Sequence, residues 1–88
     1  LGNNYPNPFN PITRFTYSLP EKVRVNITIY DIQGRAVKTL VYSEQSAGYK
    51  SIQWNATNDA GAPVSTGLYF YIIQAGNFNQ TKKMILLK

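Results

Sequence analysis

The sequence predicts an all-β fold, an antiparallel sandwich of about seven short strands. Apolar and polar residues alternate with a period of two in several stretches, and Gly, Pro, Asn or Asp residues separate these stretches. No stretch keeps the 3.6-residue period of an amphipathic helix over the length of a helix. The 88 residues suffice for one domain, which we expect to span 1–88 with a Pro- and Asn-rich lead-in at 1–11.

The lead-in has prolines at positions 6, 8 and 11, and each proline removes a backbone donor and fixes φ. This pattern excludes a helix or a regular strand there. We expect an extended segment in which Tyr5 and Phe9 pack across one face of a sheet.

Strand alternation is clearest in 12–19 and 23–30, which follow the lead-in. The alternation in the second of these stretches predicts a strand with one face exposed to solvent, which is typical of an antiparallel sheet. Residues 31–35 are interpreted as a hairpin connection with Gly34 at positive φ, followed by a short strand at 36–41. The apolar residues of the first two strands that share a face are Phe15, Tyr17, Leu19, Val23, Val25, Ile27 and Ile29.

The chain's one tryptophan, Trp54, shares a face with Ile52 in a predicted strand at 49–54. We therefore expect it between two sheets, although an exposed Trp54 that stacks on a sugar ring is the alternative. The polar loop at 55–63 carries side-chain oxygens that could ligate calcium. Only Asp59 among them is charged, so Asx-type turns explain the loop better.

The densest apolar and aromatic content lies in a C-terminal hairpin. After a brief strand at 64–66, every residue of 68–73 is apolar or aromatic, as a central strand covered on both faces requires. Gly76 and Asn77 suit a tight turn, and a final strand from 78 to 88 completes the hairpin.

Together these elements favour two antiparallel sheets packed face to face, as in immunoglobulin-like and fibronectin-III-like sandwiches. A small closed barrel is the alternative architecture. Within a sandwich, Gly67 and Tyr69 suit a tyrosine corner, in which the Tyr69 hydroxyl donates to a backbone carbonyl in 63–67.

The composition argues against catalysis. The chain has no Cys or His and only four Asp and Glu residues, so it lacks the commonest general base and the commonest transition-metal ligand. We therefore expect no enzyme activity, no cofactor and no metal site. The net charge of +5 could attract a polyanion, but no basic run exceeds two residues, so we expect no nucleic-acid partner. No apolar stretch reaches the about 18 residues of a membrane-spanning helix.

Four short motifs follow one another along the chain: NYPNPFNP at 4–11, YDIQGR at 30–35, TGLYF at 66–70 and TKKMILLK at 81–88. Together they extend over nearly the whole chain, and they resemble the type A C-terminal sorting domain of the bacterial type IX secretion system. That family shares its β-sandwich with the Ig-like domain of the flagellar hook-capping protein. The chain departs from many relatives of the hook-cap type after its tryptophan, where Asn55-Ala56 replaces Asp-Gly.

The resemblance implies a non-catalytic module at the C-terminus of a larger secreted protein, often a hydrolase, of a Gram-negative bacterium. Such a module directs export through the outer-membrane type IX translocon, where a sortase-like peptidase commonly removes it and attaches the cargo to the cell surface. The alternatives are a structural spacer beside a catalytic domain and a carbohydrate-binding accessory module that uses Trp54 or the face with Tyr69 and Tyr71. The residues that match the family's sorting motif are Gly67, Tyr69, Lys83, Met84, Ile85, Leu86, Leu87 and Lys88.

Overall fold

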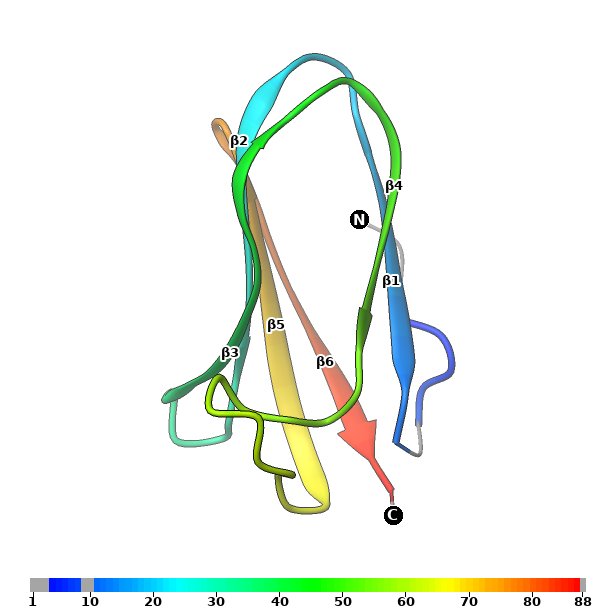
Figure 1. Ribbon diagram of the computed structural model, residues 1–88, viewed down its shortest axis with the longest axis vertical. Coiled ribbons are helices and arrows are strands. Elements are labelled where there is room, and N and C mark those ends of the chain that lie inside the picture. The colour runs from blue at the N-terminus through cyan, green and yellow to red at the C-terminus, as the bar shows by residue number, and fades with distance from the viewer. Residues whose placement is uncertain (1–3, 9–10, 88) are drawn as a thin grey trace.

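Among residues 4–8 and 11–87, which the computed structural model describes, six β-strands form two antiparallel sheets (Figure 1). The smaller sheet contains β1 and β4, and the larger sheet has the strand order β3-β2-β5-β6. In chain order the strands are β1 (Thr13–Leu19), β2 (Val23–Tyr30), β3 (Ala36–Gln45), β4 (Gly48–Trp54), β5 (Gly67–Ala75) and β6 (Phe78–Leu86).

The two sheets pack face to face, so the predicted all-β sandwich is confirmed and the closed-barrel alternative is wrong. The strand expected at 64–66 is not formed. This segment closes the loop before β5 instead, because Val64 N–H donates to the carbonyl of Ala56 at 3.0 Å. β3 continues to Gln45 rather than ending at residue 41, since its pairing with β2 extends to Val23.

The outer face of β2 is less exposed to solvent than the alternation predicts. Val25, Ile27 and Ile29 are fully buried on the inner face, as expected. On the opposite face Thr28 is also buried, and its hydroxyl donates to Asn26 Oδ1 at 2.7 Å. β2 lies between β3 and β5, so side chains on both neighbouring strands shield this face.

β5 is an interior strand of the larger sheet, as its continuous apolar run predicts. It pairs with β2 on one side and with β6 on the other. The turn to β6 begins at Gly76, which has a φ of 59°. A Cβ there would lie 2.9 Å from Val23 Cγ2, so both the backbone and the packing require glycine.

Within 4–8 and 11–87 there is no helix with the length and apolar character needed to cross a bilayer.

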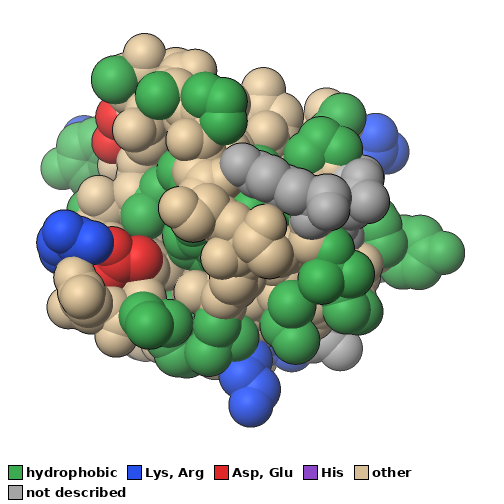
Figure 2. Space-filling view, turned by 90° about the horizontal axis from the view of Figure 1, so that it is seen from below, with side chains coloured by type: hydrophobic (Ala, Val, Ile, Leu, Met, Phe, Trp, Pro, Cys, Tyr) green, Lys and Arg blue, Asp and Glu red, His purple; other side chains and the backbone are tan. Residues whose placement is uncertain are grey.

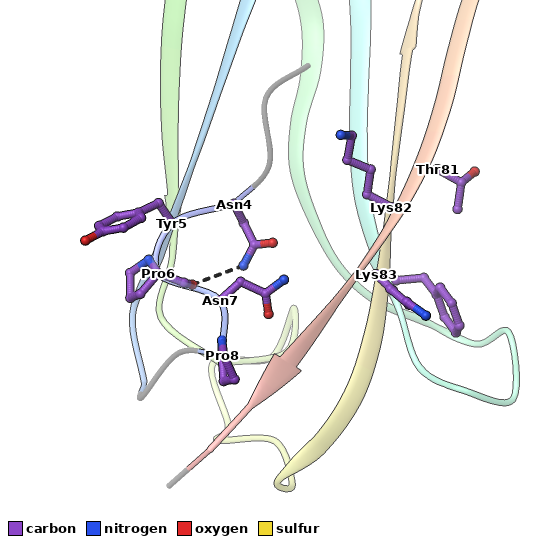
Figure 3. A pocket seen from close by; sticks show the side chains of 9 residues that line it. Asn4, Tyr5, Pro6, Asn7, Pro8, Thr81, Lys82 and Lys83 are labelled. Atoms are coloured by element: carbon purple, nitrogen blue, oxygen red, sulfur yellow. Dashed lines mark hydrogen bonds between the residues drawn. The ribbon is translucent and has the colours of Figure 1, made fainter.

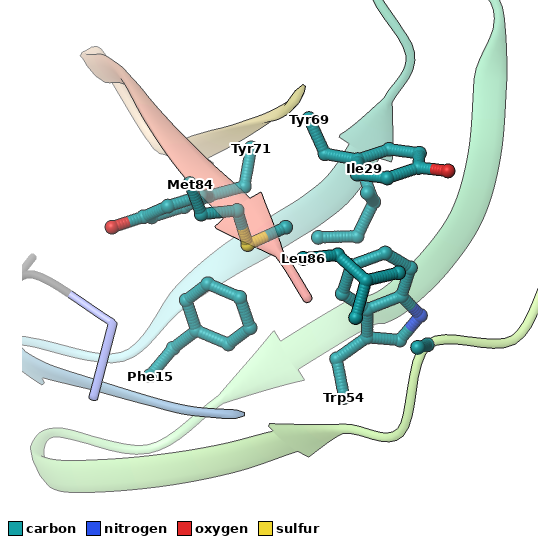
Figure 4. Packing of buried hydrophobic residues seen from close by; sticks show 8 residues of the cluster. Phe15, Ile29, Trp54, Tyr69, Tyr71, Met84 and Leu86 are labelled. Carbon is teal, nitrogen blue, oxygen red and sulfur yellow. The ribbon is translucent and has the colours of Figure 1, made fainter. Parts of the chain in front are cut away.

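Aromatic side chains from both sheets fill the space between them (Figure 4). Phe15 of β1 meets Tyr71 of β5 edge to face, with ring centroids 4.5 Å apart. Trp54 of β4 meets Tyr69 in the same way at 5.5 Å. A second buried cluster lies beside this one and consists of Tyr17, Leu19, Val25, Ile27, Val41 and Ile73. The sheets are therefore joined by aromatic contacts of a geometry that stabilises beyond simple burial.

The predicted hydrogen bond of the tyrosine corner is present. The hydroxyl of Tyr69 donates to the carbonyl of Ser65 at 2.6 Å, which ties the loop before β5 to the core. Burial, and secondarily the charge of Asp31, raises the pKa of Tyr69, so its hydroxyl stays a donor at neutral pH. Trp54 is fully buried as expected, and its Nε1–H donates to the carbonyl of Thr57 at 2.8 Å.

Ala56 has a backbone conformation that suits glycine. Ala56 has a φ of 61°, a left-handed conformation that costs a residue with a Cβ about 1–2 kcal/mol. Its methyl group is 2% exposed and packs in the aromatic cluster. Burial of that methyl offsets part of the strain, since a buried carbon of this kind contributes about 0.8 kcal/mol.

We expect Tyr69→Phe to lower the free energy of unfolding by about 0.5–1.5 kcal/mol, because the Ser65 carbonyl loses its donor. Tyr49→Phe is the matched control, since Tyr49 is 94% exposed. Chemical denaturation of both variants measures the difference. Equal midpoints for the two variants would show that the corner contributes nothing to stability.

Candidate interaction site at the C-terminal strand

The structure brings the two halves of the predicted sorting motif together. Gly67 and Tyr69 begin β5, where they lie opposite Leu86 and Met84 of β6 in the ladder. Gly67 has a φ of 148° with open space around it, so its backbone conformation rather than its packing favours glycine.

β6 divides the C-terminal part of the motif between the core and the surface. Met84 and Leu86 are 1% and 0% exposed and point into the aromatic cluster (Figure 4). Lys83, Ile85 and Leu87 are exposed on the opposite face, and Leu87 follows the end of the strand. Lys88 lies outside the described residues. Met84 and Leu86 thus contribute to folding, and the exposed side chains are available to a partner.

The lead-in is attached to the sandwich differently from the sequence prediction. Tyr5 forms an isolated antiparallel bridge with Arg14 of β1, through two backbone hydrogen bonds of 2.9 Å. Its ring is 79% exposed, so the expectation that it packs across a sheet is wrong. The same expectation for Phe9 falls outside the described residues.

Asn4 is the anchor of the lead-in, and it is 3% exposed. Its backbone N–H donates to the hydroxyl of Tyr71 at 3.1 Å, and its Nδ2 donates to Thr13 Oγ1 at 3.0 Å and to the carbonyl of Pro6 at 3.2 Å. The Thr13 hydroxyl in turn donates to the same carbonyl at 2.9 Å. Two polar groups of the core, those of Thr13 and Tyr71, are therefore satisfied by the lead-in.

Sequence reasoning missed this network, although one signal of it was present. Thr13 shares the inward face of β1 with Phe15, Tyr17 and Leu19, so its hydroxyl had to find a partner inside the protein. Which segment would supply that partner depends on long-range packing and cannot be read from alternation.

A groove of about 760 Å³ lies between the lead-in and β6 (Figure 3). The side chains of Asn4 and Asn7 point from the lead-in toward β6, and Tyr5 points away. Asn7 Oδ1 accepts a hydrogen bond from Ile85 N–H at 3.0 Å, which closes one end of the groove. The other residues that line it are Pro6, Pro8, Phe70, Thr81, Lys82 and Lys83.

Among the residues that the structure describes, two lysines and no Asp or Glu line the groove. Seen from the end of the sandwich that carries the C-terminus, Lys and Arg side chains lie at the rim, and one of them lies against an acidic side chain (Figure 2). Of the two ion pairs found within the described ranges, one joins Lys22 to Glu44 and the other joins Arg35 to Asp31. The carboxylates of these two pairs thus lie outside the groove, and the exposed ammonium group of Lys83 gives the groove a positive charge.

The YDIQGR motif forms the turn between β2 and β3. Asp31 Oδ1 accepts from the backbone N–H groups of Arg35 and Gln33 at 3.0 and 2.9 Å, and Oδ2 accepts from Arg35 Nε at 2.9 Å. The hydrogen bond from the backbone N–H of Arg35 is the main reason why the pKa of the Asp31 carboxyl is lowered. Gly34 has a φ of 80°, as predicted. The motif therefore has a structural role in this turn.

The polar loop at 55–63 uses its oxygens internally, which confirms the interpretation as Asx-type turns. Asn58 Oδ1 accepts from Ala60 N–H at 3.0 Å and from Ala62 N–H at 2.9 Å. Asp59 Oδ1 accepts from Thr39 N–H at 3.1 Å. Within the part of the chain that the structure describes, no group of three or more Asp, Glu, His or Cys residues could hold a metal ion.

The aromatic residues considered for sugar stacking are inside the protein. Trp54 and Tyr71 are 0% exposed and Tyr69 is 6% exposed. A sugar ring needs an open aromatic face, so none of the three can provide the stacking platform of a carbohydrate-binding module.

Residues 10–77 match the model of the FlgD Ig-like domain. The chain belongs to the FlgD Ig-like domain family. Its immunoglobulin-like fold thus agrees with the sequence prediction. Domains with this fold have a structural rather than a catalytic role. The chain matches no curated protein sequence.

Several solved structures have a similar fold. Latent PorU from Porphyromonas gingivalis is 22% identical with a TM-score of 0.73, over 97% of this chain and 9% of PorU. PorZ, described as an essential surface component of the type IX secretion system of the same organism, is 19% identical with a TM-score of 0.66, over 98% of this chain and 11% of PorZ. FlgD from P. aeruginosa is 23% identical with a TM-score of 0.64, over 84% of this chain and 57% of that protein. The chain thus spans about a tenth of the length of PorU and of PorZ.

We expect Thr13→Val to cost about 1–3 kcal/mol of stability, because Asn4 Nδ2 loses one acceptor and the Pro6 carbonyl loses one donor. Thr16→Val on the exposed face of β1 should change stability by no more than about 0.5 kcal/mol. Hydrogen exchange at the Tyr5 amide, which bonds to the Arg14 carbonyl, reports directly on release of the lead-in. Unchanged protection of that amide in Thr13→Val would contradict the anchoring role of the network.

We expect Leu86→Ala to cost about 2–5 kcal/mol, because it leaves a cavity in the aromatic cluster. Ile85→Ala, one position away on the exposed face, should cost no more than about 1 kcal/mol. Urea unfolding of the two variants checks the division of β6 into a buried and an exposed face. Similar losses in both variants would refute that division.

Proposed function

We propose that this Ig-like domain is a non-catalytic C-terminal module of a larger secreted protein and that it acts as a signal for outer-membrane export and cell-surface attachment. The observation that carries this proposal is the division of the TKKMILLK motif in space. Met84 and Leu86 are buried in the core, whereas Lys83, Ile85 and Leu87 are exposed and make no contribution to that core. Exposed residues of a motif that folding does not need are candidates for recognition by another protein.

The fold comparison is consistent with this role. Nearly the whole chain superimposes on parts of PorU and PorZ, and PorZ is a surface component of the type IX secretion system. At this level of identity the similarity concerns the fold, so the sorting role is supported chiefly by the sequence motifs. The partners in this proposal are an outer-membrane type IX translocon and a sortase-like peptidase, with a catalytic domain, often a hydrolase, as cargo. The location in this proposal is the exterior or the cell surface of a Gram-negative bacterium.

Membership of the FlgD Ig-like domain family favours a second candidate, a structural spacer. A spacer needs a stable sandwich and no recognition residues. The two candidates differ in whether export depends on exposed residues of the motif.

The decisive variant is Lys83→Ala combined with Lys88→Ala, made in a fusion of this domain to a reporter in a host with a type IX system. Lys83 is exposed, so its replacement should change stability by no more than about 0.5 kcal/mol. We expect the fusion to accumulate in the periplasm as a folded protein and to be lost from the cell surface. Surface labelling of intact cells and fractionation measure this.

The matched control replaces Lys22 and Lys50 by Ala, two lysines outside the motif that bond to Glu44 and Ser46 at the opposite end of the sandwich. This variant lowers the net charge by the same amount and should be exported normally. Normal surface display after deletion of the whole domain would refute the sorting role and favour the spacer.

A further inference from the structure

The outer edge of β6 presents backbone groups that are free to form hydrogen bonds. β6 is the last strand of the larger sheet, and Ile85 N–H points away from β5 toward Asn7 Oδ1. Opposed residues in an antiparallel ladder alternate between bonded and non-bonded pairs. Lys83 and Thr81 lie opposite Phe70 and Ile72 two and four positions before Ile85, so their N–H and C=O groups also point outward. Within 4–8 and 11–87, no backbone hydrogen bond from another segment reaches these groups.

The lead-in supplies a second, independent feature of the same groove. Asn4 is 3% exposed, and its Oδ1 has no hydrogen-bond partner within the described ranges. The amide orientation is determined by its neighbours. The Pro6 carbonyl can only accept, and the Thr13 hydroxyl uses its proton on that carbonyl, so the amide nitrogen must face both. The oxygen therefore points the other way, toward β6 (Figure 3), and requires a donor.

The charge of the groove selects the kind of occupant. Lys83 lines it and is exposed, no Asp or Glu is among its described lining residues, and the chain carries a net charge of +5. Lysines on an edge strand disfavour pairing between two copies of the same chain, because like charges are brought together. They favour an edge partner that carries acidic side chains. A glycan could satisfy the charge, but it has no backbone groups that repeat at the spacing of a strand.

We propose that the groove between the lead-in and β6 binds an extended acidic segment of a partner protein, which adds to the larger sheet as a strand beside β6. The backbone of the segment pairs with the outward groups of Thr81 and Lys83, and an acidic side chain lies beside Lys83. Asn4 Oδ1 accepts a hydrogen bond from the segment. Because Asn7 already occupies Ile85 N–H, pairing ends there and involves about five residues of the segment. The site does not depend on the export role proposed above.

The first test titrates the 88-residue chain with a fluorescein-labelled peptide, Gly-Glu-Val-Glu-Val-Glu-Gly, at concentrations up to about 1 mM and low ionic strength. We expect saturable binding, with shifts of the Thr81 and Lys83 amide resonances and slower exchange of both amide protons. The charge-reversed peptide, with Lys in place of Glu, should not bind. Absence of saturable binding by the acidic peptide would overturn the proposal.

Thr81→Pro removes one of the N–H groups that point outward from β6 and leaves the ladder with β5 intact, because Thr81 and Ile72 form a non-bonded pair of that ladder. We expect at least about tenfold weaker peptide binding. Thr81→Val is the matched control, since it keeps the N–H, and should bind within about twofold of the unmodified chain. Lys83→Glu should weaken binding about fivefold or more. Near-UV circular dichroism verifies the fold of each variant.

Two N-methylated peptides keep the proposal testable if Thr81→Pro does not fold. Alternate residues of an added strand face β6, so methylation of one alternate set of nitrogens should abolish binding and methylation of the other set should not. Equal binding by both peptides would refute strand addition. Identical amide shifts with dextran sulfate would refute it in favour of charge alone. Concentration-dependent dimerisation that shifts the Thr81 and Lys83 amides would instead make a second copy the occupant.

Discussion

The architecture depends on two tyrosine hydroxyls that β5 places at the edge of the core. Tyr69 and Tyr71 point inward and are almost completely buried, so each hydroxyl must be satisfied inside the protein. Tyr69 donates to the Ser65 carbonyl and fixes the loop that leads into β5. Tyr71 accepts from the Asn4 backbone N–H and fixes the lead-in. One strand thus positions both irregular segments that border the sandwich.

The same strand positions β6, and this explains how one short motif can serve two purposes. A strand presents alternate residues to opposite faces, so the pairing with β5 sends Met84 and Leu86 into the aromatic cluster and leaves Lys83 and Ile85 outside. Substitution of the outer residues changes the surface without removing core contacts. A recognition motif located on an edge strand can therefore vary or be read by a partner while the fold persists.

The outer edge of β6 is where the lead-in meets the larger sheet. Asn7 of the lead-in bonds to Ile85 N–H, which protects that end of the strand from further pairing. The neighbouring Lys83 discourages association between copies of this basic chain. What remains is a short basic groove with unpaired strand groups, a surface that distinguishes an acidic extended partner from a second copy.

Local pattern alone determined much of the fold. Alternation in 12–19 and 23–30, the apolar run at 68–73 and the turn glycines Gly34 and Gly76 predicted the strands, the interior place of β5 and the two hairpins. These features could be predicted because side-chain period and positive φ are properties of a few neighbouring residues. The burial of Trp54 and the Tyr69 hydrogen bond followed from the same reasoning.

Tertiary structure alone decided how the lead-in attaches and where the groove lies. The sequence pointed to the aromatic rings of Tyr5 and Phe9 as anchors, whereas a buried asparagine, Asn4, bonds to Thr13 and Tyr71 at distances of 9 and 67 residues along the chain. Residues 64–66 close a loop instead of forming a strand, because the N–H of Val64 donates a hydrogen bond to the carbonyl of Ala56. Such choices depend on which polar groups the packed sheets leave without a partner, and that is known only once the sheets have met.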